Sequence, residues 1–202
     1  ELLPQMAEKG IQMKSFADLS PALQAKAEEY FKTQIYPIIT PLAIDEAHPF
    51  PTISNQSRSY MVRLRHPKTE EKLYARIKVP ANRPRWIVME ETDSSRTMVS
   101  TSELIRLNMS AFFPGIEVEA THLFRVTRNA DIERNEEEAE DLLEMIADEL
   151  RERRFAEIVR LELDAETPDD ITELLKRELR VEERDIYRME GPIGLVDLMS
   201  IA

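Results

Sequence analysis

Basic side chains concentrate between residues 58 and 85, where nine lysines and arginines stand against two glutamates, a formal charge of +7. Apolar and polar residues alternate within this segment over 60–65 and again over 72–79. Because alternate side chains of a β-strand point to opposite faces, an antiparallel hairpin would place its cations together on one polar face. These cations are Arg63, Arg65, Lys72, Arg76 and Lys78.

Several fixed cations on one face are suited to binding a polyanion, because they offset the hydration that the anion loses. The alternative is a face that is only solvated, or one that packs against an acidic part of the same chain. Residues 131–149 contain ten acidic residues against one arginine, a formal charge of −9. The sequence leaves both alternatives open.

A second polar cluster lies at the end of an extended run: Arg125, Arg128, Asn129 and Asp131. Arg125 alternates with two apolar neighbours, so we expect its side chain to project away from the core. Arg128 and Asn129 follow at the strand end, a common position for groups that contact ligands. The alternative is a structural arginine–aspartate ion pair that organises the turn before the next helix.

Glycine, histidine and cysteine exclude several kinds of site. The four glycines are widely separated in the sequence: Gly10, Gly115, Gly191 and Gly194. This spacing excludes a P-loop and a dinucleotide-binding fingerprint. The histidines at 48, 66 and 122 show no ligand spacing and no Ser/His/Asp context, so we expect surface or packing roles for them. Cysteine is absent, which excludes disulfides, thiolate catalysis and cysteine-based zinc sites.

Composition defines the class of protein. The chain has 202 residues, 42% of them hydrophobic, and its 27 basic against 39 acidic residues give a net charge of −12. These values predict a soluble globular protein of one domain, or at most one and a half, and they argue against a nucleic-acid-coating function. A reducing, cytoplasmic compartment fits the lack of cysteine. No apolar run approaches the roughly 20 residues of a membrane-spanning helix, and no signal-peptide pattern occurs.

The N-terminal half predicts a helix, an irregular stretch and strands. Residues 1–9 are helix-like, with Gly10 as the stop, and we expect this segment, which begins at Glu1, to be part of a longer protein. Ser20-Pro21 is a helix start, and Pro37 ends the helix. Residues 37–55 are too rich in proline for a regular helix and too apolar for a solvated linker, so an ordered, packed crossing segment is expected. Residues 85–89 form a further strand.

The C-terminal half interleaves helices and strands. A helix is expected to begin with a Ser100/Glu103 capping box and to end at Pro114-Gly115, and an extended run over 116–128 follows it. The remaining expected elements are a helix 135–150, a strand 157–163, a helix capped by residues 167–170 and a strand 185–189. Hairpin pairing together with interleaved helices predicts an α+β fold, a largely antiparallel sheet with helices packed on it.

The chain also contains a series of short motifs: YPIITPLAID at 36–45, HPFP at 48–51, Ser54-Asn55, ARIKVP at 75–80, Pro84-Arg85, FPG at 113–115, FRVTRNAD at 124–131, DLL at 141–143, RRF at 153–155, VRLE at 159–162 and GPIGLVDL at 191–198. In this order they cover nearly the whole chain. Together they resemble the head region of the polyphosphate kinases of the first family.

That resemblance implies an enzyme that moves the terminal phosphate of ATP onto polyphosphate, reversibly, through a phosphohistidine and with Mg²⁺. It implies a homo-oligomer, dimer or tetramer, that is cytoplasmic or peripherally membrane-associated and has no nucleic-acid partner. Residues 1–12 would be the end of an N-terminal helical domain, and residues 13–202 the head (middle) domain. The ATP-contacting asparagine would precede Glu1, and the nucleophilic histidine and magnesium-binding arginines would follow Ala202.

Two functions follow from this resemblance. In the first, the head domain lines the nucleotide and polyphosphate tunnel and contributes to dimerisation, but contains no catalytic, cofactor-binding or metal-binding residue, so the chain alone is expected to be inactive. In the second, it is a noncatalytic dimerisation or binding module without substrate contact. The candidate polyphosphate-binding residues of the first function are Arg63, Arg65, Arg76, Lys78, Arg125 and Arg128.

Overall fold

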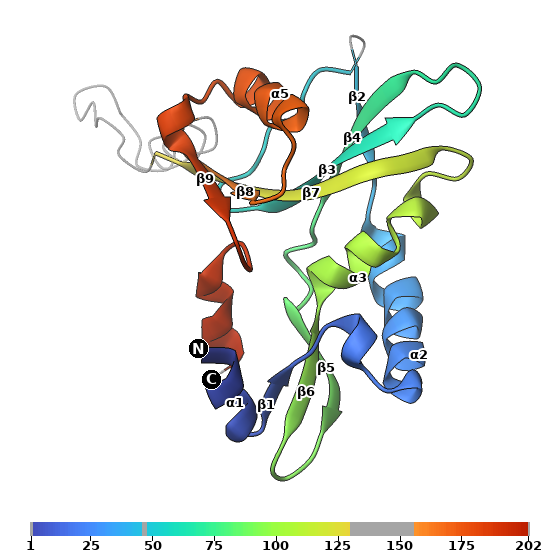
Figure 1. Cartoon of the computed structure of the whole chain (residues 1–202), viewed down its shortest axis with the longest axis vertical. Helices are drawn as coiled ribbons and strands as arrows, with labels where there is room; N and C mark the ends of the chain where they lie inside the picture. Colours follow the sequence, from blue (N-terminus) through green and yellow to red (C-terminus); the bar gives the residue numbers. More distant parts are fainter. Residues whose placement is uncertain (1, 46–47, 130–155, 202) are drawn as a thin grey trace, which may run out of the picture. The chain divides into compact units, whose positions relative to one another are not determined.

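The computed structural model describes residues 2–45, 48–129 and 156–201 (Figure 1). They divide between two compact units. Unit 1 comprises residues 1–43, 62–121 and 196–202, and unit 2 comprises residues 44–61 and 122–195. The predicted helix 135–150, the acidic segment and Asp131 lie outside the described residues.

The described helices are α1 (Leu2–Glu8), α2 (Pro21–Tyr30), α3 (Thr101–Leu107) and α5 (Asp169–Leu179). The strands are β1 (Ile11–Met13), β2 (Leu42–Ile44), β3 (Arg58–Arg65), β4 (Lys72–Lys78), β5 (Trp86–Glu91), β6 (Arg96–Ser100), β7 (Glu117–Arg128), β8 (Ile158–Asp164) and β9 (Ile186–Met189). No helix in the described part of the chain is long and apolar enough to cross a membrane.

Strand pairing confirms the α+β prediction. In unit 1, β1-β6-β5 form one sheet, in which β5 and β6 are antiparallel and β1 runs parallel to β6. Unit 1 also holds the neighbouring strands β2, β4, β3 and β7. In unit 2 the strand order is β3-β7-β8-β9, with an antiparallel β7–β8 pair and a parallel β8–β9 pair. Strands β2, β3 and β7 contribute residues to both units.

Helix α2 begins where the sequence predicts. The Ser20 hydroxyl accepts a hydrogen bond from the backbone N–H of Leu23 at 3.4 Å, and Pro21 occupies the first helical position. Ala27, Phe31 and Ile35 are buried along one side. A π-helical turn and then a 3₁₀ turn follow, and the helical segment ends at Ile38, directly after the predicted terminator Pro37.

The predicted capping box of α3 is wrong. The helix does begin after Ser100, but the Ser100 side chain makes no capping hydrogen bond. Oε1 of Glu103 instead accepts a hydrogen bond from the backbone N–H of Phe16 at 2.9 Å. Ser100 is also the last residue of β6, a strand that the local sequence pattern did not predict. Its pairing with Trp86 on β5 holds the Ser100 backbone in an extended conformation. A long-range contact therefore takes the place of a local one.

Helix α5 covers one side of β8 and β9 in unit 2 (Figure 1). Ile171 and Leu175 are buried on the helix, and Leu161 and Leu163 are buried on β8. The predicted cap is shifted, because Pro168 occupies the N-cap position and its ring supplies no side-chain acceptor. The Thr167 hydroxyl donates instead to the carbonyl of Asp164 at 2.7 Å and closes the turn after β8.

Gly10 is required where α1 meets β1. Its φ of +81° lies in the left-handed region, and an added Cβ would stand 2.1 Å from the carbonyl oxygen of Ser94. We expect Gly10→Ala to lower the free energy of unfolding by more than about 2 kcal/mol, because backbone strain and a backbone clash add. The matched control is Gly191→Ala, where nothing lies within 4 Å and φ is ordinary. Urea unfolding followed by circular dichroism measures both, and equal stabilities would contradict the account.

Candidate anion-binding sites

Two arginines of unit 1 converge on one carboxylate. Nε of Arg63 lies 3.2 Å from Oε2 of Glu119, and Nε and Nη2 of Arg65 contact Oε1 of the same glutamate. Glu119 comes from β7 and the two arginines from the same face of β3, where they stand two residues apart. We call these three residues the Glu119 cluster. Its two guanidiniums exceed the single carboxylate by one positive charge, and the Arg65 side chain is 40% exposed.

The two other candidate polyphosphate-binding residues of the hairpin, Lys78 and Arg76, differ from each other. Lys78 is exposed at the end of β4, as an open polar face requires. Arg76 is only 4% exposed, and burial lowers the pKa of its guanidinium. The expectation of an open face along the whole strand is therefore wrong at Arg76. Ala75 and Ile77 on the other face of β4 are buried as well, so this part of the strand is covered on both sides.

Unit 2 repeats the arrangement of unit 1. Nη1 of Arg125 on β7 donates to both carboxylate oxygens of Glu162 on β8, at 3.2 and 3.3 Å, and Nε of Arg160 donates to Oε1 at 2.9 Å. Arg125 and Glu162 are direct partners in the antiparallel register. We call these three residues the Glu162 cluster. It too carries one surplus positive charge, around a carboxylate side chain that is 8% exposed.

Arg125 projects as the sequence predicts. Its neighbours Phe124 and Val126 are buried on the opposite face of β7. The side chain is nevertheless only 12% exposed, because Glu162 and the carbonyl of Gln56 cover it. The predicted arginine is thus on the expected face but is already engaged.

Arg128 acts as a clamp within unit 2. Its Nε donates to the carbonyl of Ile53 at 3.0 Å, its Nη1 donates to the carbonyl of Ala156, and its backbone N–H donates to Oδ1 of Asn55 at 2.9 Å. Burial lowers the pKa of its guanidinium. These bonds tie the 53–57 turn to the ends of β7 and β8. The alternative ion pair with Asp131 lies outside the described residues.

Histidines 48 and 66 have local structural contacts. Nδ1 of His48 lies 2.9 Å from Oδ1 of Asp45, whose carboxylate also accepts the His48 backbone N–H. Nδ1 of His66 accepts from the backbone N–H of Thr69 at 3.2 Å within the hairpin turn. Over residues 2–45, 48–129 and 156–201, no three His, Cys, Asp or Glu residues gather as metal ligands.

Residues 22–201 match the family model described as polyphosphate kinase middle domain. The chain belongs to the polyphosphate kinase family. A polyphosphate kinase of Synechocystis sp. is 42% identical over 98% of this chain and 28% of that protein. Polyphosphate kinase 1 of Chlorobaculum tepidum is 37% identical over 100% of this chain and 30% of that protein. The chain thus spans less than a third of the length of these two polyphosphate kinases.

A solved structure shares the fold. The crystal structure of polyphosphate kinase from Porphyromonas gingivalis superposes with a TM-score of 0.77 over 100% of this chain and 28% of that one, at 21% identity. It corroborates the α+β architecture of this polyphosphate kinase segment.

The Glu119 and Glu162 clusters include residues that sequence reasoning missed. It selected Arg63, Arg65 and Arg125 but neither glutamate, and it did not select Arg160. Arg160 and Glu162 stand two residues apart in the VRLE motif, so a strand places them on one face. That alternation was the available signal, whereas the pairing with Arg125 depends on the register of β7 against β8.

Glu162 should be important for stability. We expect Glu162→Ala to lower the free energy of unfolding by about 3 kcal/mol, because it leaves the largely buried Arg125 guanidinium without its carboxylate. The control is Glu173→Ala, which removes an ion pair with Lys176 on α5 in which the glutamate side chain is 67% exposed. That change should cost less than about 0.5 kcal/mol in the same urea titration. A decrease of similar size in both variants would contradict the assigned role of the Glu162 cluster.

Proposed function

We propose that this chain is the head domain of an enzyme that transfers the terminal phosphate of ATP to polyphosphate, reversibly, with a phosphohistidine and Mg²⁺ contributed from outside these residues. The observation that carries the proposal is the match of residues 22–201 to the middle-domain model. Residues 13–202 would form the head domain and residues 1–12 the end of a helical domain. The contribution of the head domain is to bind and orient substrate along the tunnel.

The proposed polyphosphate contacts are the accessible cations of the candidate set. Arg63, Arg65 and Lys78 supply three positive charges in unit 1, and Glu119 contacts the two arginines. A carboxylate that holds two guanidiniums fixes their positions, so less side-chain entropy is lost when a phosphate chain binds. In unit 2, Arg125 is only 12% exposed and already bonds to Glu162, so it is assigned a positioning role there.

Arg76 and Arg128 have a supporting role in the proposal. Arg76 is enclosed within β4, and Arg128 bonds to the carbonyls of Ile53 and Ala156. Neither can meet a phosphate without leaving its present surroundings. They are therefore assigned to holding the strands and the 53–57 turn in place.

Assembly is the second candidate function. Unit 1 exposes large apolar side chains that a homo-oligomeric contact would cover: Tyr36, Ile38, Leu42 and Leu107. Three of these side chains, Tyr36, Ile38 and Leu42, follow one another closely along the chain. We assign the domain a part in a homo-oligomer of a cytoplasmic enzyme, with peripheral membrane association as a further property of the whole protein.

The unit 1 contacts can be tested by binding. We expect the 202-residue chain to bind long-chain inorganic polyphosphate with salt-sensitive affinity, and the double variant Arg65→Gln/Lys78→Gln to bind about tenfold more weakly. The slope of log Kd against log salt should fall by about one for each cation–phosphate interaction that the substitutions remove. Isothermal titration calorimetry at several salt concentrations measures both quantities.

The matched control for this test is Lys32→Gln/Arg106→Gln, which removes two exposed cations of unit 1 elsewhere on its surface. It changes net charge equally and should leave the affinity within about twofold. If both double variants bound polyphosphate equally weakly, the loss of affinity would follow from net charge alone. That result would contradict a specific contact at Arg65 and Lys78.

Covalent chemistry gives an independent prediction. After incubation with [γ-³²P]ATP and Mg²⁺, the chain alone should carry no acid-labile phosphate, because the proposed nucleophile lies outside it. Intact mass spectrometry at neutral pH detects phosphohistidine. Stoichiometric phosphorylation of the isolated chain would contradict the proposal.

A further inference from the structure

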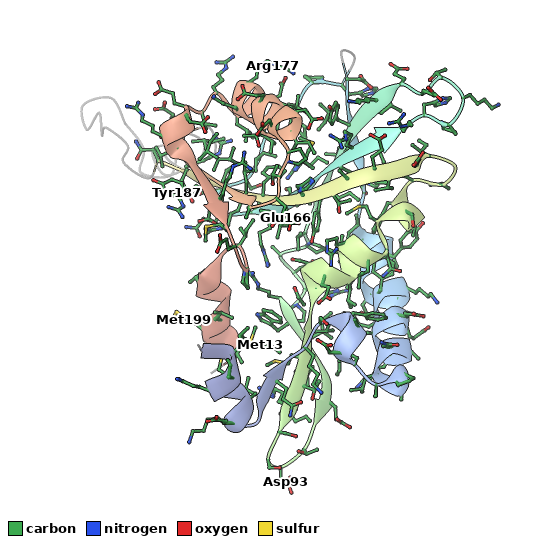
Figure 2. The ribbon with its side chains drawn as sticks, in the orientation of Figure 1. Met13, Asp93, Glu166, Arg177, Tyr187 and Met199 are labelled. Carbon is green, nitrogen blue, oxygen red and sulfur yellow. The ribbon has the colours of Figure 1, made fainter. Side chains whose placement is uncertain are left out.

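Strand β9 presents an aromatic side chain on the sheet face opposite α5. Nη1 of Arg188 donates to the carbonyl of Thr167 at 2.6 Å and Nη2 to the hydroxyl of Thr172 at 3.2 Å, so Arg188 faces α5. Its neighbour Tyr187 therefore points to the other face. The register agrees, because Tyr187 pairs with Glu162 and Arg188 with the buried Leu163. Figure 2 labels Tyr187 on β9.

Tyr187 is held by the Glu162 cluster. The guanidinium carbon of Arg160 lies 3.8 Å from the centroid of the Tyr187 ring, in cation–π contact, while Nε of the same arginine donates to Glu162. Tyr187 remains 43% exposed. An exposed aromatic ring fixed by a cation on one face has little conformational entropy left to lose on binding.

Charge on this face favours an anion. Arg125 and Arg160 contribute two positive charges against the single carboxylate of Glu162. Nε of Arg160 makes its bond to Glu162, and a guanidinium has five N–H donors, so its terminal nitrogens are not needed for that ion pair. This face therefore combines the Tyr187 ring with two guanidiniums. Tyr187 pairs directly with Glu162, the carboxylate that bonds to both Arg125 and Arg160.

We propose that this face, made by Arg125, Arg160, Glu162 and Tyr187, binds a nucleoside polyphosphate, with the base on Tyr187 and the phosphates at Arg160, the more exposed of the two arginines that Glu162 holds. Base–aromatic stacking and guanidinium–phosphate contacts are the interactions that these residue types supply. A chain of phosphates alone would make no use of the aromatic ring. The choice of a nucleoside polyphosphate over other aromatic anions rests on the proposed function.

The test compares ATP with inorganic tripolyphosphate, which has the phosphates without the base. In calorimetric titrations of the 202-residue chain, ATP should bind about tenfold more tightly than tripolyphosphate. Tyr187→Leu should abolish that difference, whereas Tyr187→Phe should retain it. Arg160→Gln should weaken both ligands, and Arg184→Gln, an exposed arginine of the same unit, should weaken neither.

Three results would overturn the proposal. The first is tripolyphosphate binding as tightly as ATP to the unsubstituted chain. The second is an ATP preference that survives Tyr187→Leu in a variant whose circular dichroism is native. The third is a single-stranded oligonucleotide that binds in a Tyr187-dependent way and more tightly than ATP, which would assign the face to nucleic acid. The Arg65→Gln/Lys78→Gln variant separates the two proposals. Its affinity for long-chain polyphosphate stays unchanged if the unit 1 contacts are wrong, and its preference for ATP over tripolyphosphate is absent if the Tyr187 face is wrong, so the two failures are distinguishable.

Discussion

One carboxylate shared by two guanidiniums on neighbouring strands is the interaction on which both units depend. Glu119 holds Arg63 and Arg65 in unit 1, and Glu162 holds Arg125 and Arg160 in unit 2. Neither glutamate side chain is more than 13% exposed, so each charge would be costly without its partners. The ion pairs offset that cost. Within each cluster, two guanidiniums stand against one carboxylate, a surplus of one positive charge.

This surplus connects the architecture to the chemistry of the polyphosphate kinase family. A domain that binds phosphates for another segment needs cations that are fixed in place and not fully neutralised. The sheets provide such cations, since strand register sets the spacing between guanidiniums and carboxylates.

The local pattern predicted elements well wherever one face of an element is buried. Alternation identified β3, β4, β7 and β8 and the direction of Arg125, because a period of two is a property of the strand itself. It failed at Arg76, whose burial depends on what covers the other face of β4. It also failed at Glu103, which bonds to Phe16 from 87 positions away. The partners of the arginines were missed for the same reason, since cross-strand contacts are set by register rather than by neighbouring residues.

The most direct measurement is a crystal structure of the chain grown with tripolyphosphate. The account predicts phosphate oxygens on the outer N–H groups of Arg65 or Arg160, with the contacts of Glu119 and Glu162 to their arginines intact. An anion that displaces either glutamate from its arginines, or that binds only at cations outside the two clusters, would contradict it.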